Sequence, residues 1–531
     1  MTHAGWLPDR RQLLQWASAS AAGLYLPRRA WAQTRTATNP FALGLASGAP
    51  THDSVVLWTR LVFDGEQASG QPHPPVSVRW EVAHDEQFAR IVQTGQSQAV
   101  AALAHSVHVE VRGLEADRWY FYRFAVGEAL SASGRTRTFP APDAVVARLR
   151  LAYASCQRWE HGHFSAYRHM RDENLDMVLF LGDYIYEYPS ASNAVRMPTG
   201  GWVRTLDDYR QRYALHKGDA DLQAMHATCP WLLTWDDHEV QNDYAGLTAG
   251  DSGPPVADFA AQRAAAYQAF YEHMPIRASA LSRALAGLAQ GAEMRIYQRL
   301  HYGRLASLYL LDARQYKDAQ VCSRDGKKGA STLNPAICPA WNDPARSLLG
   351  QPQERWLEAE LGRAASRQGG WNLLGQTSLF GQRDFQRGPG QRLWNDGWDG
   401  YASARTRLTD ALQKNAVSNP VLMGGDVHEN WVGHVKADYA DAASPAIGVE
   451  FCGTSITSRS AGNAKIPEWL AENPHFVFAD SERKGYGVVE LTPRGLTTRL
   501  RVVSDVTEPD TRIETLAQFS VQAGRAVIEK T

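Results

Sequence analysis

Cysteine is scarce in this sequence, and so is an excess of charge of either sign. Five cysteines in 531 residues are too few for a disulfide-based scaffold. A formal net charge of −1 argues against nucleic acid or an anionic membrane as the main partner. No segment contains 18 uncharged apolar residues, so no membrane-spanning helix is predicted. Internal repeats and low-complexity tracts are also lacking. The length instead indicates more than one globular domain.

The first 33 residues have the three parts of an export signal, in the usual order. Arg10 and Arg11 form a twin-arginine pattern, a mildly apolar run covers residues 16–26, and a small-x-small cleavage site at 30–32 precedes Gln33. An amphipathic helix is the less favoured alternative, because it does not explain this order. We therefore predict a periplasmic or secreted protein that uses the twin-arginine machinery, which exports folded chains.

Residues 40–142 are predicted to form an N-terminal β-sandwich domain. Segments 54–61, 76–82, 106–111 and 119–124 alternate apolar and polar residues with period two. Tyr120 lies six residues after Leu114, which is typical of the tyrosine corner of a fibronectin-like sandwich. A proline-containing segment at 139–142 then forms a stiff linker.

Residues 148–531 are predicted to form an α/β catalytic domain. Short apolar runs that end in polar residues alternate with helical segments, as in parallel sheets. The predicted helices are 164–173 and 256–271. The predicted strands are 149–154, 175–181, 231–235, 305–311, 371–374, 420–423, 485–491 and 496–503.

Four of these strands are followed by side chains that can bind a metal ion. Each residue alone has an ordinary structural explanation: a helix cap, a satisfied histidine or a buried cysteine. Four such strand ends are unlikely to coincide by chance, and ligands gather beyond the carboxyl ends of parallel strands. The residues are Cys156; Asp183 with Tyr186; Asp237, His238 and Asn242; and Asp426 with His428.

The donor types predict two kinds of ion. Thiolate, phenolate, carboxylate and imidazole together suit Fe(III) better than Mg(II). Asp237, Asn242 and Asp426 offer oxygen only, which suits Ca(II), and Asp183 is placed to bridge the two sites. Two such cations can clamp a phosphate and activate a hydroxide between them.

These blocks resemble the PhoD-like alkaline phosphatases. The similar stretches are 154–157, 181–186, 234–244, 311–316 and 425–428, of which 234–244 begins Thr-Trp-Asp-Asp-His-Glu. The resemblance covers essentially the whole chain. It implies a four-layer α/β/β/α metallophosphoesterase core related to purple acid phosphatases. It also implies one ferric ion, two calcium ions and hydrolysis of phosphate monoesters or diesters.

The resemblance also assigns roles by position. It places iron ligands at Cys156, Asp183, Tyr186 and His428, and calcium ligands at Asp183, Asp237, Asn242 and Asp426. Whether Asp236 also binds calcium stays open. His238 corresponds to a histidine that contacts the phosphoryl or leaving oxygen, so His238 and Asp183 are the expected catalytic residues.

The remaining cysteines have simpler interpretations. Cys322 and Cys338 lie in a polar insertion, and in an oxidising compartment they are expected to form a disulfide. Cys229 and Cys452 are expected to be core residues. For Arg314 and the aromatic segment 394–401, a position in the substrate cleft and a structural ion pair with a packed loop are equally good interpretations.

The main functional prediction is an exported phosphatase that acts on small phosphate mono- or diesters, most simply as a monomer. A phospholipase D-type phosphodiesterase on the same fold is the alternative. A binding or adhesion protein with an inert metal domain is less favoured, because no predicted ligand is missing.

Overall fold

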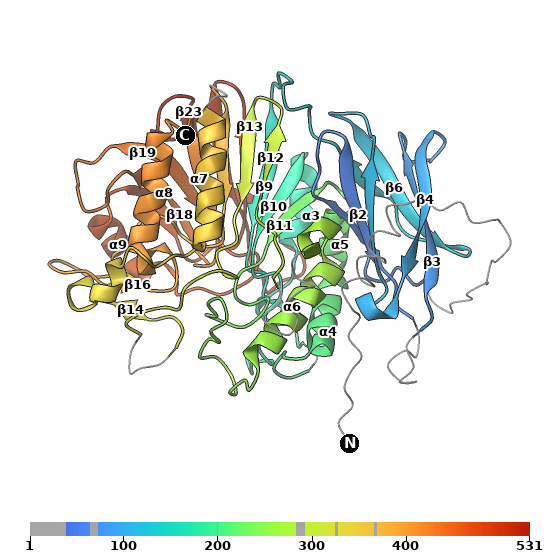
Figure 1. The fold of residues 1–531 in the computed structure, drawn as a ribbon, viewed down its shortest axis with the longest axis horizontal. Helices are drawn as coiled ribbons and strands as arrows, with labels where there is room; N and C mark the ends of the chain where they lie inside the picture. The colour runs from blue at the N-terminus through green and yellow to red at the C-terminus, as the bar shows by residue number, and fades with distance from the viewer. Residues whose placement is uncertain (1–38, 64–72, 199, 283–292, 324–327, 366–368) are drawn as a thin grey trace. The chain divides into compact units, whose positions relative to one another are not determined.

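The computed structural model describes residues 39–63, 73–198, 200–282, 293–323, 328–365 and 369–531 (Figure 1). The predicted export signal lies outside these residues. Contacts divide the chain into two units. Unit 1 comprises Met1–Pro140, Arg204–Trp231 and Ala260–Arg295, and unit 2 comprises Ala141–Val203, Leu232–Phe259 and Ile296–Thr531.

Unit 1 contains the predicted β-sandwich. All four predicted strands form, and two antiparallel sets enclose a core that includes Val55, Val109 and Phe124. The Tyr120 hydroxyl accepts a hydrogen bond from the Glu115 backbone N–H at 2.9 Å, as a tyrosine corner requires. One set is β1 (Leu45–Gly48), β2 (Ser54–Arg60) and β5 (Ser106–Arg112); the other is β4 (Ile91–Ala99), β3 (Val76–Ala83), β6 (Trp119–Val126), β7 (Ala129–Leu130) and β8 (Gly134–Arg137).

Three helices also belong to unit 1 by their contacts: α4 (Leu206–Lys217), α5 (Ala220–His226) and α6 (Phe259–His273). Thr205 and Asp208 form a capping box at the start of α4. The Trp58 indole of β2 donates to the Glu272 carbonyl of α6 at 2.9 Å. These helices come from the part of the chain predicted as one catalytic domain, so packing does not follow chain order here.

Unit 2 contains two larger sheets. In the first, β9 and β10 are parallel and β21 pairs antiparallel with β9. In the second, β13, β15, β17 and β19 are parallel. The first sheet has, in order, β24 (Ile528–Lys530), β23 (Ile513–Gln522), β22 (Gly495–Val503), β21 (Gly485–Leu491), β9 (Leu149–Ala154), β10 (Met177–Leu181) and β11 (Trp231–Thr234); the second has β12 (Gln298–Tyr302), β13 (Ala306–Leu310), β15 (Trp371–Gly375), β17 (Pro420–Gly424), β19 (Ala446–Cys452), β18 (Asn430–Lys436) and β20 (Phe476–Asp480).

The two sheets of unit 2 pack face to face. A Cβ on Gly375 of β15 would lie 3.0 Å from the Leu179 side chain of β10. Helices α7 (Gln351–Ala365) and α8 (Ala402–Lys414) cover the outer face of the second sheet, with Leu361 and Leu412 in a core shared with Leu422. On the first sheet, α3 (Ala166–Met170) lies against β21. This layering confirms the predicted α/β/β/α fold.

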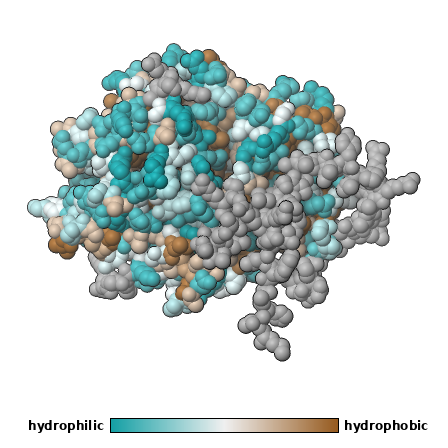
Figure 2. All heavy atoms as spheres, viewed as in Figure 1, coloured by the Kyte–Doolittle hydropathy of each residue, from teal (hydrophilic) through white to brown (hydrophobic). Residues whose placement is uncertain are grey.

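The face that carries α7 and α8 is mainly hydrophilic (Figure 2). A groove between the two helices has an apolar floor that includes Leu357 and Leu408. Within the described part of the chain, no helix is both long and apolar enough to cross a membrane.

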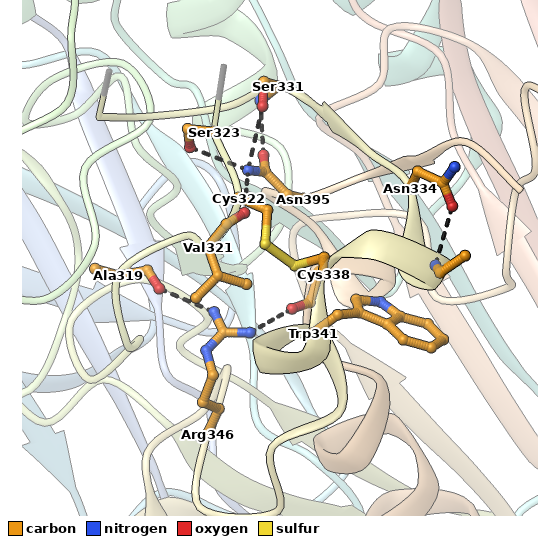
Figure 3. The surroundings of a disulfide bond; sticks show 12 residues. Ala319, Val321, Cys322, Ser323, Ser331, Asn334, Cys338, Trp341, Arg346 and Asn395 are labelled. Atoms are coloured by element: carbon orange, nitrogen blue, oxygen red, sulfur yellow. Dashed lines mark hydrogen bonds between the residues drawn. A yellow bond between two sulfur atoms is a disulfide. The ribbon is translucent and has the colours of Figure 1, made fainter. Parts of the chain in front are cut away.

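The predicted disulfide is present between Cys322 and Cys338, whose Cα atoms are 6.1 Å apart (Figure 3). The buried Asn395 side chain donates to the Val321 carbonyl at 2.9 Å and accepts from the Ser331 N–H at 2.6 Å, so it holds both sides of this insertion. A two-stranded ribbon of β14 (Thr332–Leu333) and β16 (Leu393–Trp394) lies in the same region. Cys229 and Cys452 are buried free thiols, as expected.

Candidate metal centre

The loops that leave β9, β10 and β17 are bent in an unusual way. Cys156, Asp183, Asp426 and His428 have φ angles of 59°, 60°, 64° and 58°. Non-glycine residues seldom adopt this left-handed conformation, and such strain gathers at functional sites. These loops also pack closely against one another: a Cβ on Gly425, the residue before Asp426, would lie 2.3 Å from the Ser155 hydroxyl.

The four predicted iron ligands lie together. Ligand atoms of Cys156, Asp183 and His428 all lie within 4.8 Å of one another. The Tyr186 hydroxyl donates to Asp183 at 2.9 Å and lies 3.2 Å from His428 Nε2. His428 Nδ1 contacts the Arg459 carbonyl at 2.8 Å, so its Nε2 faces the cluster. The sequence prediction had placed these side chains at one point, and the structure has them there.

The predicted calcium ligands are adjacent. Carboxylate oxygens of Asp236, Asp237 and Asp426 also lie within 4.8 Å of one another. Asp183 and Asp237 form a further group with one ring nitrogen of His238, so Asp183 lies in both parts of the cluster. Asn242 is held through its backbone N–H, which donates to Glu187 at 2.8 Å.

Three oxygens of this cluster favour a bound cation. Asp183 Oδ1, Asp236 Oδ2 and Asp237 Oδ1 are buried and have no hydrogen-bond partner among the residues that the structure describes. Buried, unpaired carboxylate oxygens are costly, and a cation would compensate them. Burial raises the pKa of Asp183 well above its usual value, and neighbouring Asp237 adds to this shift. The donors present therefore fit a bound metal cation.

Comparisons with known proteins agree with this geometry. The family model for the PhoD-like phosphatase matches residues 151–500, and the model for the N-terminal domain of that family matches residues 27–140. The chain belongs to the PhoD-like phosphatase family. It is 42% identical to alkaline phosphatase D of Bacillus subtilis (strain 168) over 538 residues, which covers 98% of this chain and 89% of the relative.

A solved structure of PhoD superposes with a TM-score of 0.86 at 42% identity and covers 94% of this chain and 93% of the other. These matches confirm the predicted family, fold and enzyme class, a phosphatase. The ligand assignments above stay predictions.

Two glutamates that the sequence prediction missed organise the centre of this PhoD-like chain. Glu239 is 1% exposed and accepts three backbone N–H groups, from Asp183 at 3.2 Å, Tyr184 at 2.6 Å and Asp236 at 2.8 Å. Burial raises the pKa of Glu239 to about 7, against the lowering effect of these donors. Glu239 thereby ties the loop after β10 to the loop after β11. Its place in the Thr-Trp-Asp-Asp-His-Glu block was the available signal.

Glu187, the second glutamate, orients the predicted catalytic histidine. His238 Nδ1 lies 2.7 Å from Glu187 Oε2, and the other oxygen accepts from the Asn242 N–H. Burial disfavours a charged imidazole, but the carboxylates of Glu187, Asp237 and Asp183 outweigh it and raise the pKa of His238 well above its usual value. The Tyr186 ring packs 4.1 Å from the imidazole ring.

Arg314 proves to be a structural cation. It is 2% exposed, pairs with Asp236, contacts Asp396 at 2.7 Å and lies 3.6 Å from Asp237. One Asp236 oxygen is therefore occupied by Arg314 and the other faces the cluster. Trp398 of segment 394–401 is buried as well. Of the two interpretations given for Arg314 and this segment, the structure supports the ion pair and packed loop.

Proposed function

We propose that this chain is an exported, metal-dependent phosphatase that hydrolyses small phosphate esters at a mixed Fe(III) and Ca(II) centre and acts as a monomer. The observation that supports it most is the set of three unpartnered carboxylate oxygens beside a cysteine, a tyrosine and a histidine. Alkaline phosphatase D of Bacillus subtilis, the relative at 42% identity, supports phosphate ester hydrolysis. The domain limits 40–142 and 148–531 are part of the same proposal.

The residues divide into two ligand sets. Cys156, Asp183, Tyr186 and His428 would hold iron. Asp237, Asn242 and Asp426, with Asp183 shared, would hold calcium, and the family resemblance favours two calcium ions. When bound, the ions would neutralise phosphoryl charge and make a nucleophilic hydroxide available near neutral pH.

The chain's own contribution to the reaction comes from His238. Its ring lies beside Asp183 and Asp237, and Glu187 fixes its orientation through Nδ1. An imidazole held in this way can donate a hydrogen bond to phosphoryl oxygens or protonate the leaving oxygen. Catalysis of phosphoryl transfer consists mainly of such positioning and charge stabilisation.

Activity on p-nitrophenyl phosphate and on its bis ester, combined with metal analysis of the exported protein, tests this proposal. We expect turnover of the monoester, iron and calcium in the purified enzyme, and loss of activity with a calcium chelator that calcium reverses. Better recovery with zinc would contradict the calcium assignment. A strong preference for the bis ester would favour the phosphodiesterase alternative, and no turnover of either ester would favour a binding protein.

Export is tested separately. Replacing Arg10 and Arg11 by lysine should leave the folded enzyme inside the cell, because the twin-arginine pattern requires both arginines. Undiminished export of the double variant would contradict the twin-arginine route without affecting the enzymatic proposal.

A further inference from the structure

Among the predicted ligands that the structure describes, exposure to solvent is uneven. Cys156, Asp183 and Tyr186 are each 1% exposed and Asp237 is 3% exposed. By contrast, Asn242, Asp426 and His428 are half-buried. The alcohol part of a phosphate ester bound at the centre must therefore project past these three residues. The side chains that flank them are the ones that can distinguish one ester from another.

On the His428 flank, one backbone segment connects two histidines. The Arg459 carbonyl contacts His428 Nδ1 at 2.8 Å, and the Arg459 N–H donates to His161 Nδ1 at 3.0 Å. Because Nδ1 of His161 accepts this bond, the ring proton is on Nε2. His161 is half-buried and Arg459 is exposed, so this donor and this cation lie at the open side.

The side chains that act most strongly on the pKa of His161 are basic. Burial, together with Arg158, Arg459, His428 and Lys484, lowers the pKa of His161 to about 3. His161 is therefore a neutral N–H donor at any working pH. Lys484 is fixed by donation to the His428 carbonyl at 2.8 Å.

Arg158 completes this cationic flank. Its guanidinium lies over the Tyr188 ring, 4.7 Å from the ring centroid, and its Nε lies 3.6 Å from the buried Glu160 carboxylate. An additional negative charge on a substrate is therefore stabilised on the His428 side.

We propose that His161 and Arg459 form a subsite for a second anionic group, a carboxylate or a phosphate, on the alcohol part of the substrate. The inference rests on the proposed phosphatase function and narrows it to phosphate esters that carry further negative charge. Arg459 already donates to the Asn193 carbonyl from one guanidinium nitrogen at 2.8 Å, which holds its side chain at the rim and leaves other N–H groups for an anion.

Two substrates that differ by one group test the subsite: glycerate 3-phosphate and glycerol 3-phosphate. The wild-type enzyme should show the higher kcat/KM for the glycerate. Arg459→Gln should lower the glycerate-to-glycerol ratio about tenfold, since a charge-assisted hydrogen bond is lost. His161→Asn should lower it severalfold, because the asparagine oxygen can still accept the Arg459 N–H while the Nε2 donor is gone.

Arg494→Gln is the matched control, because Arg494 is exposed in the turn between β21 and β22, at the end of β21 away from Lys484. Its ratio should equal that of the wild type. A ratio unchanged in Arg459→Gln, or equal losses on both substrates in Arg459→Gln and His161→Asn, would overturn the subsite. A wild-type enzyme that is inactive on both esters and on p-nitrophenyl phosphate would instead refute the proposed function.

Discussion

Replacing Glu187 by glutamine should separate catalysis from metal binding. The carboxylate uses both oxygens, one for His238 Nδ1 at 2.7 Å and one for the Asn242 N–H at 2.8 Å. Glutamine offers a single acceptor oxygen, so one of these two donors loses its partner. A hydrogen bond to a charged group contributes about 1.5–3 kcal/mol. If the lost bond is the one that orients His238, kcat should fall about ten- to hundredfold.

The assay is kcat on p-nitrophenyl phosphate and on glycerol 3-phosphate, with metal content measured for each variant. His238→Ala should cost roughly a hundredfold or more while the metals stay bound. The loss should be smaller for p-nitrophenyl phosphate, whose leaving group needs little protonation. Because Glu187 acts through His238, the double variant should be no slower than His238→Ala alone.

Glu358→Gln on the exposed face of α7 is the control for the change of charge and should have wild-type kinetics. Wild-type turnover in Glu187→Ala, which removes both acceptor oxygens, would refute the orienting role. Equal losses on both substrates would exclude proton donation to the leaving group, although stabilisation of the phosphoryl oxygens would still explain them. Loss of metal together with activity would mean that Glu187 and His238 support the ligands instead.

Three further predictions concern Cys156, His108 and the Cys322–Cys338 disulfide. Cys156→Ser should remove iron and the visible charge-transfer absorption expected from thiolate and phenolate ligands, and an iron-free variant with full activity would contradict the assignment. Burial lowers the pKa of His108 to about 4 although its ring contacts the Tyr271 and Met274 carbonyls, so its stabilising effect is complete above pH 6.5 and is lost as the pH falls toward 4. The free energy of unfolding should therefore fall by about 2 kcal/mol more in the wild type than in His108→Asn between pH 7.5 and 5, as measured by denaturant titration. Replacing Cys322 and Cys338 by serine should cost about 3 kcal/mol locally and speed proteolysis between them, and unchanged cleavage rates would show that the Asn395 contacts suffice.

The strands that hold the centre were predictable because they are buried on both faces. Residues 149–154, 177–181, 231–234 and 420–424 are mainly apolar runs, with Arg150 the one charged residue, and polar residues follow each of them; they match β9, β10, β11 and β17 closely. Strands such as β4 and β23 were missed, since their alternating polar and apolar residues are interrupted by glycine or by exposed polar side chains.

Helix α4 was missed for a different reason. Its buried positions include Tyr209, Arg212 and His216, so it has no apolar stripe to indicate a helix. The assignment of α4, α5 and α6 to unit 1 was equally hidden, because it depends on contacts such as that of Trp58 with Glu272, far apart in the chain.

The candidate metal ligands were predictable, but the residues that hold these ligands in position were not. A metal ligand at a strand end has a typical residue type and position. Glu187 and Glu239 accept backbone N–H groups from loops far away in the sequence, from Asn242 and from Asp183 and Tyr184, and these pairings have no characteristic spacing. For Glu239, only its place in the Thr-Trp-Asp-Asp-His-Glu block was a signal. Arg314 could not be assigned either, since an arginine that pairs with Asp236 and one that binds substrate look the same until burial is known.

Metal loading and folding should be strongly coupled in this protein. Four non-glycine residues at the centre have φ near 60°, which costs about 1 kcal/mol or more for each. Glu239 holds three backbone amides of the same loops in place. The buried oxygens of Asp183, Asp236 and Asp237 that have no hydrogen-bond partner among the described residues are costly to keep ionised without a cation. Bound ions would offset the backbone strain and the cost of burying these carboxylates, so the free energy of ion binding contributes directly to folding. A chain of this kind gains from acquiring its metals before it leaves the cell, which agrees with the twin-arginine pattern at Arg10 and Arg11.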